Sequence, residues 1–445
     1  MAERASIPLS VPLTTKCTVP DLRNERNPMS LISLMALLPL TLMTLSDDPA
    51  PSKVDWSTAQ QEAIKFLIDA QENVTATEGG TEISTGEWPY EGVYRERGQI
   101  PPGYRVGGTA IVMRSILETQ SEQLSKLKKS PPLIPALERG LRFLLKESVQ
   151  APRMGVGFNG RYDVRDWGHI EALETLLRMQ QLDRVPTDLE TPVKNLITTL
   201  IKTLEENEIK GGGWNYSRSR RGASPASPFM TAPAVLALFR ARELGYDIDT
   251  GIIERALDTI ENARLESGAV QYSTNPERAT GEGFEALEGA CARMAVSELA
   301  LSLGGRSSLD RVRFSVKSFF DHWKWLERRR AQTGTHNPPF YIAPYYFFYG
   351  HLHVARAIEL LPKEEQEKAR QQLLKLLWQV KDPEGTWNDR VFPRSACYGT
   401  AMTLLALKSP ATPLPAEFKP AEIKKPLPKL KEENGKAEKS EPVSL

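Results

Sequence analysis

Two acids and a histidine lie close together between Asp163 and His169, where the sequence is Asp-Val-Arg-Asp-Trp-Gly-His. If a helix has begun by Asp166, this residue and His169 are one turn apart, and the carboxylate can orient the imidazole. Such a pair can hold and transfer a proton, so Asp163, Asp166 and His169 are the catalytic candidates. The alternative is structural: Asp166 caps the helix by accepting from the free amides of its first turn, while Arg165 points to solvent.

A dense run of aromatic residues begins at Tyr341 and continues as far as two histidines, His351 and His353. Its rings could line a pocket for a lipid or prenyl chain and stabilise a cation, or they could simply pack in the core. The two histidines cannot share a helical face, so a metal site built from them is not expected. From this run we take Tyr345, Tyr346 and His351 as candidates for lining a ligand cavity.

Further cavity candidates come from the loops that precede apolar segments. Arg218 lies where the N-terminus of a following helix already favours an anion. Glu285 belongs to a series of glutamates spaced by three residues, which forms an acidic site only if it faces the cavity. The remaining candidates belong to glycine-containing turns and the loops after them: Trp88, Trp214, Tyr216, Trp387 and Asp389.

The elements that must position these residues repeat along the chain. A turn with an aromatic or apolar residue occurs six times, starting at Gly86, Gly155, Gly212, Gly268, Asn337 and Gly385. A segment with one apolar stripe precedes each turn, which is typical of a helix lying on a surface. The clearest stripe contains Val193, Leu196, Ile197, Leu200, Ile201 and Leu204.

A segment that is apolar on nearly every side follows each turn, and such a helix must be buried. These predicted inner helices cover residues 107–119, 167–181, 230–244, 284–303, 342–361 and 396–408. One hairpin of about 45 residues cannot bury its own apolar face, so the copies must pack together. Closure into a ring would remove the apolar ends of an open solenoid. We therefore predict an all-α fold of six helical hairpins, with an inner and an outer ring, over residues 47–408.

Composition narrows the functional classes. A chain of 445 residues could hold two or three average domains, but the repeats require one large domain. The net charge is +1, so no global field favours nucleic acid, and we expect no nucleic-acid partner. Cys291 and Cys397 lie among apolar neighbours, as small core residues do, so we expect no disulfide framework, metal site or cofactor.

Both ends of the chain differ from the repeats. Residues 1–28 lack periodicity and are expected to be unstructured or to precede the true translation start. Residues 29–46 resemble a signal peptide, since the apolar stretch is shorter than the roughly 20 residues of a spanning helix and contains Pro39. Export to the periplasm or beyond is therefore expected, with an uncleaved membrane or envelope anchor and a cytoplasmic location as the alternatives. Residues 409–445, rich in proline, lysine and glutamate, are predicted to form a disordered tail that could bind a protein partner.

The sequences Gly212-Gly-Trp-Asn-Tyr and Gly385-Thr-Trp, each followed by a helix rich in alanine and leucine, resemble a known repeat. It is shared by squalene cyclases, other class II terpene cyclases and protein prenyltransferase β subunits. The resemblance covers residues 56–408 and implies an α/α toroid with a central cavity. Fold alone does not establish function.

The catalytic signatures of these families are missing. The cyclases protonate an alkene with an Asp-x-Asp-Asp motif, to which only Asp163 and Asp166 come near. Cys291 resembles one zinc ligand of the prenyltransferases, but Gly289 and Ser395 stand where the resemblance places the aspartate and histidine ligands. Zinc needs three protein ligands, so no metal is expected.

Two functional hypotheses follow. In the first, which we favour, the chain is an exported squalene-cyclase-like toroid repeat protein without cyclase or prenyltransferase chemistry. It binds an apolar or isoprenoid ligand, a carbohydrate or a protein. In the second it is an enzyme: a divergent terpene cyclase with Asp163 or Asp166 as the acid, or a polysaccharide-acting (α/α)6 enzyme. A glycosidase would need two carboxylates about 5 to 10 Å apart.

Overall fold

The structure, a computed structural model, describes residues 55–78, 81–124, 133–151, 154–155, 164–216, 225–274 and 280–419. The predicted leader and signal peptide, together with Asp163 and Arg218, lie outside these ranges. Within them, no helix is both long enough and apolar enough to cross a membrane.

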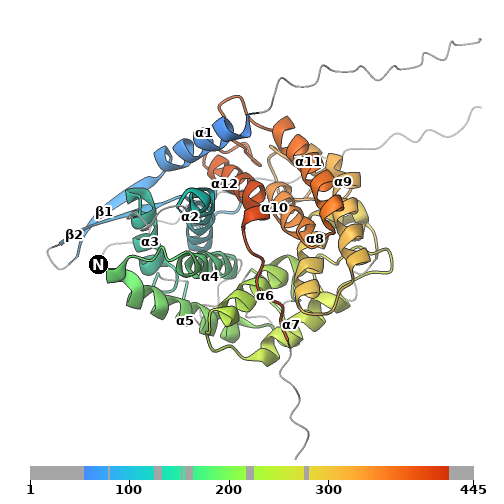
Figure 1. The fold of residues 1–445 in the computed structure, drawn as a ribbon, viewed down its shortest axis with the longest axis horizontal. Helices are drawn as coiled ribbons and strands as arrows, with labels where there is room; N and C mark the ends of the chain where they lie inside the picture. The colour runs from blue at the N-terminus through green and yellow to red at the C-terminus, as the bar shows by residue number, and fades with distance from the viewer. Residues whose placement is uncertain are drawn as a thin grey trace, which may run out of the picture. The chain divides into compact units, whose positions relative to one another are not determined.

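Six helices form a closed inner ring (Figure 1). They are α2 (Pro102–Leu124), α4 (Arg165–Gln181), α6 (Pro228–Glu243), α8 (Leu287–Leu303), α10 (Tyr346–Ile358) and α12 (Ser395–Lys408). Each packs on the next, and α12 packs on α2, so the ring has no open apolar end. In α12 every residue from Ser395 to Ala406 is buried, as expected for a helix with neighbours on all sides. The predicted α/α toroid is confirmed.

Six outer helices surround this ring (Figure 1). They are α1 (Trp56–Asp69), α3 (Pro135–Glu147), α5 (Glu190–Asn207), α7 (Thr250–Asn262), α9 (Leu309–Arg329) and α11 (Lys363–Gln379). Most pack chiefly on the inner helix that precedes them in the ring, and α1 accordingly packs on α12. All six residues of the predicted stripe in α5 are buried, which confirms that the apolar face of an outer helix points inward.

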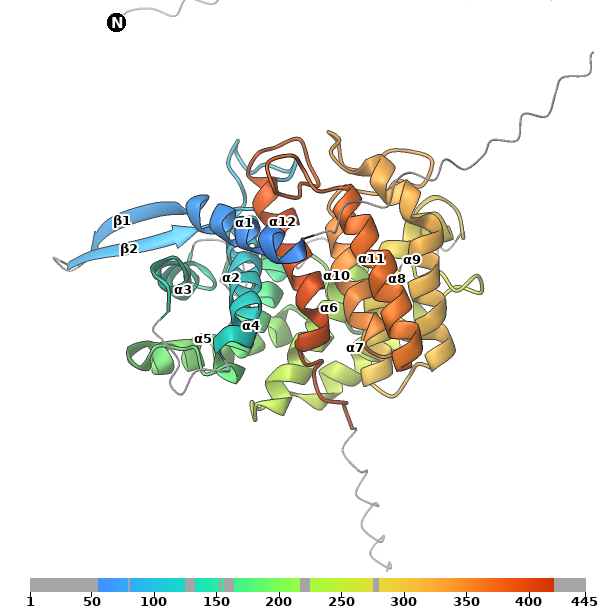
Figure 2. The same cartoon turned by 45° about the horizontal axis from the view of Figure 1, so that its top comes forward.

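One β-hairpin interrupts the helical pattern. Strand β1 (Glu72–Glu78) pairs antiparallel with β2 (Thr81–Glu87), and Glu72 lies opposite Glu87. The hairpin extends away from the ring beside α3, against which β2 packs (Figure 2). Its alternation of threonine, valine and isoleucine with polar residues suits a half-exposed strand.

The predicted tail would leave the toroid after Lys408. The structure instead keeps residues 409–419 packed against it. Residues 409–419, here called the strap, continue across the end of the ring where the inner helices finish. Phe418 is only 5% exposed, its ring stacks on Phe239 at 5.4 Å, and its amide donates to the carbonyl of Leu303. Composition alone suggested disorder because it averages this single anchoring ring over many polar residues. Residues 420–445 lie outside the described ranges.

Candidate functional site

The turn tryptophans lie between the two helical layers and do not face the middle of the ring. Each is at most 1% exposed. The indole Nε1 donates to a carbonyl in the last turn of the preceding outer helix, over 2.6 to 2.8 Å: Trp88 to Leu67, Trp214 to Leu204, and Trp387 to Leu377. These residues clamp an outer helix to the ring. This corrects the prediction that they line a ligand cavity, because no indole face remains open.

A residue of the inner helix fixes each of these turns from the other side. The backbone amide of the tryptophan donates over 2.9 to 3.0 Å to a threonine hydroxyl: Thr109, Thr231 and Thr400. In α4 and α10 a histidine follows a glycine in the same way that Thr109 and Thr400 do. His169 and His351 therefore occupy a position whose role in the other repeats is to hold the layers together.

The structure brings Asp166 and His169 together, as predicted, but buries the pair. His169 Nε2 lies 2.9 Å from the carbonyl oxygen of Met154, which can only accept, so Nε2 carries a proton. Nδ1 lies 3.4 Å from Asp166 Oδ1, and this oxygen also accepts from Asn207 Nδ2 at 2.7 Å. Asp166 and His169 are 1% and 0% exposed. The pair joins α4 to its turn and to α5, where a substrate cannot reach it.

The capping alternative for Asp166 is also wrong. Helix α4 has Val164 at its N-cap, in the left-handed region with φ +52°, and no side chain caps the helix. Arg165 is fully buried and does not point to solvent. The sequence suggested a cap because an acid in a first helical turn usually serves one, whereas here Asn207 from another helix takes up the carboxylate.

His351 likewise faces the outer layer. Its Nδ1 lies 2.7 Å from the Phe347 carbonyl and therefore carries the proton, while its Nε2 accepts from the indole of Trp323 on α9 at 3.0 Å. Burial lowers the pKa of His351 to about 4, so the ring is neutral. This placement corrects the prediction that His351 lines a cavity.

Aromatic rings fill the interior at the end where the inner helices begin. The ring centre of Phe229 on α6 lies 4.9 Å from that of Tyr346 and 4.5 Å from that of Tyr349. Both tyrosines are on α10, which is separated from α6 in the ring by α8. The Tyr349 hydroxyl donates to the Phe229 carbonyl, and that of Tyr398 donates to the Tyr345 carbonyl. Tyr345 and Tyr346 are 8% and 3% exposed. Tyr345 and Tyr346 therefore pack in the core and do not line a ligand cavity, since their rings occupy the volume that an isoprenoid chain would need.

Asp389 is a buried acid beside these rings. It is 0% exposed, and its Oδ2 accepts from the Tyr90 hydroxyl at 3.0 Å. The Arg390 guanidinium donates to the same hydroxyl at 3.3 Å. Burial raises the pKa of Asp389 to about 6, although Arg390 and Tyr90 partly offset this effect. Asp389 was predicted as a cavity residue, but the structure encloses it.

The raised pKa predicts a pH-dependent stability. Between an ordinary pKa of 3.8 and about 6, folded Asp389 holds a proton that the unfolded chain has released, so stability falls as pH rises through this window. Asp389→Asn should remove this loss and raise the free energy of unfolding above pH 6 by about 1–3 kcal/mol. Urea unfolding from pH 4 to pH 8 measures it. The exposed control Asp247→Asn should keep the wild-type slope, and an unchanged slope in Asp389→Asn would contradict the assignment.

An accessible group of rings lies at the same end of the toroid. We call Tyr272, Phe284, His336 and Tyr341 the aromatic rim; Tyr341 is 40% exposed and the other three are half-buried. The Phe284 ring stacks on that of Tyr341, with 5.2 Å between ring centres, and its centre lies 4.8 Å from that of Tyr272. The His336 ring meets Phe284 edge-on, with 5.1 Å between ring centres. The four rings therefore form one contact cluster, and Tyr341 is its most exposed member.

The backbone holds Tyr341 in a strained conformation. Its φ is +52°, in the left-handed region that residues other than glycine rarely adopt. Its amide donates to the Asn337 carbonyl at 2.9 Å, and its own carbonyl accepts from His336 Nδ1 at 2.7 Å. Such strain persists only where the surrounding contacts enforce it, and it occurs often at binding sites.

Glu285 supplies a carboxylate at this rim. Its Oε1 accepts from the Tyr272 amide at 3.0 Å, while its buried Oε2 has no hydrogen-bond partner in the described ranges. Burial raises the pKa of Glu285. The predicted glutamate stripe does not form, because Glu285 ends a short 3-10 turn and α8 begins only at Leu287.

Two further tyrosines connect the rim to the packed interior. The hydroxyl of Tyr216, a half-buried residue, donates to that of Tyr345 at 2.8 Å, and Tyr345 also hydrogen-bonds to Tyr272. Arg293 lies behind the rim, with its guanidinium 5.8 Å from the centre of the Tyr272 ring and donating to the Phe284 carbonyl. Tyr216 is therefore the one turn aromatic among our candidates that remains beside an accessible surface.

The sequence analysis missed most of the rim. A usable signal was the tyrosine four residues after the turn glycine, which recurs as Tyr90, Tyr216 and Tyr272. Phe284, His336 and Tyr341 carry no periodic signal, because Phe284 lies in a short 3-10 turn before α8 and the other two lie in the loop between α9 and α10.

No protein-family model matches the sequence, and no curated protein resembles it significantly. Similar solved structures include an inactive variant of an α-1,6-mannanase of family GH76 from Salegentibacter, bound to α-1,6-mannotriose. It has 12% identity over 80% of this chain and 99% of that chain, with a TM-score of 0.48. A type II terpene cyclase from Scytonema has 13% identity over 80% of this chain and 97% of that chain, with a TM-score of 0.41. A possible GH105 member from Klebsiella pneumoniae has 14% identity over 85% of this chain and 98% of that chain, with a TM-score of 0.46. No functional conclusion follows from similarity at this level.

Proposed function

We propose that this chain is a carbohydrate-binding α/α toroid whose ligand packs on the aromatic rim. The observation that carries the proposal is the stack of accessible rings beside Glu285. Aromatic faces carry partial negative charge, which suits the polarised C–H groups of a sugar ring. Glu285, which is only 5% exposed, accepts from the Tyr272 amide through Oε1 and so fixes the backbone beneath this rim ring. A few polar groups placed beside apolar rings are typical of ligand sites.

The same geometry supports binding rather than catalysis. Among the candidate acids that the structure describes, Asp166 and Asp389 are at most 1% exposed, while Asp163 lies outside the described residues. An isoprenoid ligand in the ring is disfavoured, because Phe229, Tyr346 and Tyr349 pack against one another across the interior. Export remains part of the proposal, since the signal-like residues 29–46 suggest a protein that meets its carbohydrate outside the cytoplasm.

Removing a rim ring should weaken carbohydrate binding. Tyr341→Ala is expected to lower affinity about tenfold, since an aromatic stacking contact contributes roughly 1–1.5 kcal/mol. Glu285→Gln should lower it less, because the amide keeps one oxygen acceptor. Calorimetric titration with neutral and acidic oligosaccharides measures both effects.

The matched control is Tyr246→Ala, which removes a half-buried tyrosine after the C-terminal end of α6, far along the helix from the rim. It should bind as the wild type does. Equal losses in Tyr246→Ala and Tyr341→Ala, or no binding of any oligosaccharide by the wild-type chain, would contradict the proposed function.

A further inference from the structure

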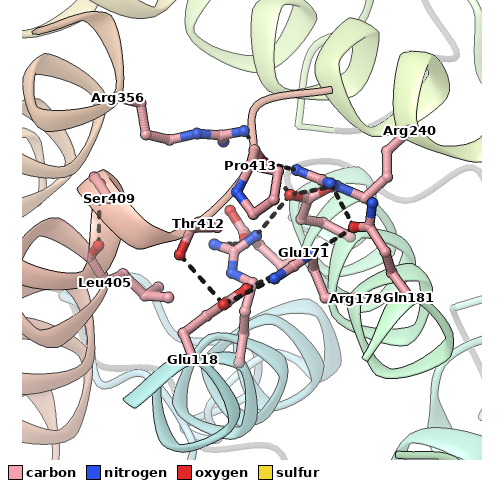
Figure 3. Close-up of polar contacts among 12 residues, drawn as sticks. Glu118, Glu171, Arg178, Gln181, Arg240, Arg356, Leu405, Ser409, Thr412 and Pro413 are labelled. Carbon is pink, nitrogen blue, oxygen red and sulfur yellow. Dashed lines mark hydrogen bonds and ion pairs between the residues drawn. The ribbon is translucent and has the colours of Figure 1, made fainter. Parts of the chain in front are cut away.

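Charged side chains of several inner helices meet at the opposite end of the ring, where these helices finish; Figure 3 labels Glu118, Arg178, Arg240 and Arg356 among them. We call them the closed-end cluster. They are Arg114, Glu118, Glu171, Glu174, Arg178, Arg240 and Arg356. Four arginines face three glutamates, so the cluster has one positive charge in excess. Burial raises the pKa of Glu171, which favours its neutral form and further weakens the negative side of this balance.

The ion pairs within the cluster are unevenly shared. Arg178 and Glu118 form a two-point contact over 2.5 and 2.9 Å. Glu174 instead serves three arginines: Arg240 reaches it at 3.2 Å, Arg114 at 3.8 Å and Arg356 at 4.0 Å. Arg356 is therefore the arginine with the weakest internal partner.

Arg356 contacts its nearest carboxylate, that of Glu174, only at 4.0 Å. Its side chain is 12% exposed, and its Nη2 has no hydrogen-bond partner among the described residues. Burial lowers the pKa of Arg356 to about 10, so the guanidinium is still charged at neutral pH. His353, one turn earlier on α10, also has a buried Nδ1 without a partner there. A buried guanidinium donor is costly unless an acceptor meets it.

Helix ends do not supply that acceptor. The C-terminal turns of α4, α6 and α10 carry partial negative charge, which favours arginines such as Arg178, Arg240 and Arg356. In the described residues, however, no carbonyl accepts a hydrogen bond from Arg356 Nη2. The helix dipoles therefore stabilise the positive charge of Arg356, but they supply no hydrogen-bond acceptor for its Nη2.

The strap covers the cluster. Arg240 Nη2 donates to the Pro413 carbonyl at 3.1 Å, and the Thr412 hydroxyl donates to Glu118 Oε2 at 3.2 Å. The Arg356 guanidinium points toward the strap near Pro413 (Figure 3). Farther along, the Ala416 amide donates to Glu243 Oε2, which holds the strap on α6. The strap thus lies over this end of the cluster, where the Arg356 side chain is only 12% exposed.

We propose that a small oxyanion, of the size of phosphate or sulfate, binds at the closed-end cluster between Arg356 and Arg240, beneath the strap. Guanidinium groups pair with the oxygens of such anions through parallel hydrogen bonds, and the excess charge of the cluster is neutralised on binding. His353 supplies a further polar contact on the α10 side. The site lies at the end of the toroid opposite the aromatic rim and is independent of carbohydrate binding.

The test is thermal unfolding and calorimetric titration of the full chain with phosphate and with sulfate, each compared with chloride at equal ionic strength. Both oxyanions should raise the unfolding temperature of the wild type beyond the effect of chloride. Arg356→Gln should weaken oxyanion binding at least tenfold, and Arg356→Lys should weaken it less because it retains the charge.

The matched control is Arg313→Gln, which removes an arginine from an ion pair on the exposed face of α9. It should bind oxyanions as the wild type does. The proposal would be overturned if phosphate and sulfate stabilised the wild type no more than chloride. Equal oxyanion binding by Arg356→Gln and Arg313→Gln would overturn it as well.

Discussion

Replacing Trp214 with alanine is expected to lower the free energy of unfolding by about 3–5 kcal/mol, the usual range for removing a large buried aromatic side chain. Trp214 is 0% exposed and fills the space between α5 and α6. The change would leave a cavity between the layers and would also leave the Leu204 carbonyl without its indole donor. Equilibrium unfolding in urea, followed by circular dichroism, measures the loss.

Two matched variants separate the causes of that loss. Trp214→Phe keeps most of the apolar volume but removes the indole donor, so it should lose less than alanine does. Thr231→Val keeps the volume of the inner-helix anchor and removes its hydroxyl, which accepts from the Trp214 amide at 3.0 Å. Leu309→Ala, at a 39% exposed position, should have little effect. A loss in Trp214→Ala no larger than in Leu309→Ala would contradict the clamp.

Breaking the buried pair between Glu118 and Arg178 should have a similar effect. Both residues are 2% exposed, so Glu118→Ala would leave the Arg178 cation enclosed without its partner. Loss of one member of a buried ion pair typically costs about 3–5 kcal/mol. Glu118 also accepts from Thr412, so the strap should loosen at the same time. Urea unfolding measures the stability, and limited proteolysis measures the release of the strap.

The double variant Glu118→Leu with Arg178→Met should recover most of the stability, because apolar side chains of similar size can replace both charges together. The surface control is Glu365→Ala, whose partner Arg313 makes an Arg–Glu contact of the same kind on the outer layer. Solvent screens that pair, so only a small loss is expected. If Glu118→Ala and Glu365→Ala lost the same stability, the buried pair would not hold this end of the ring together.

The two proposed sites use opposite ends of one ring. At the end where the inner helices begin, aromatic packing leaves Tyr341 exposed at a rim that the buried Glu285 supports through the Tyr272 amide. At the other end, the strap covers an excess of positive charge around Arg356. Because no described side chain belongs to both sites, their tests are independent of each other.

The sequence by itself determined the architecture of this protein. The spacing of apolar residues along an amphipathic helix shows which of its faces is buried. The stripe in α5 was therefore predictable without any knowledge of its neighbours. The inner helices were visible for the complementary reason, since a segment such as residues 396–408 has no side that tolerates water. Repetition then required the copies to pack together, because no single hairpin can bury both of its helices.

Only the tertiary structure decided where the polar and aromatic side chains of the inner layer lie. A helix buried on all sides has no periodic signal that separates the face toward the middle from the face toward the outer helices. His169 therefore looked like a catalytic residue and His351 like a cavity residue, but they meet Met154 and Trp323 between the layers. The rim depends on the packing of neighbouring repeats, which brings Tyr272 and Phe284 beside His336 and Tyr341, and the strap depends on the contact of Phe418 with Phe239 on α6. Local sequence records how much of a helix is buried, whereas the packing of the two layers in the folded ring sets the identity of each neighbour.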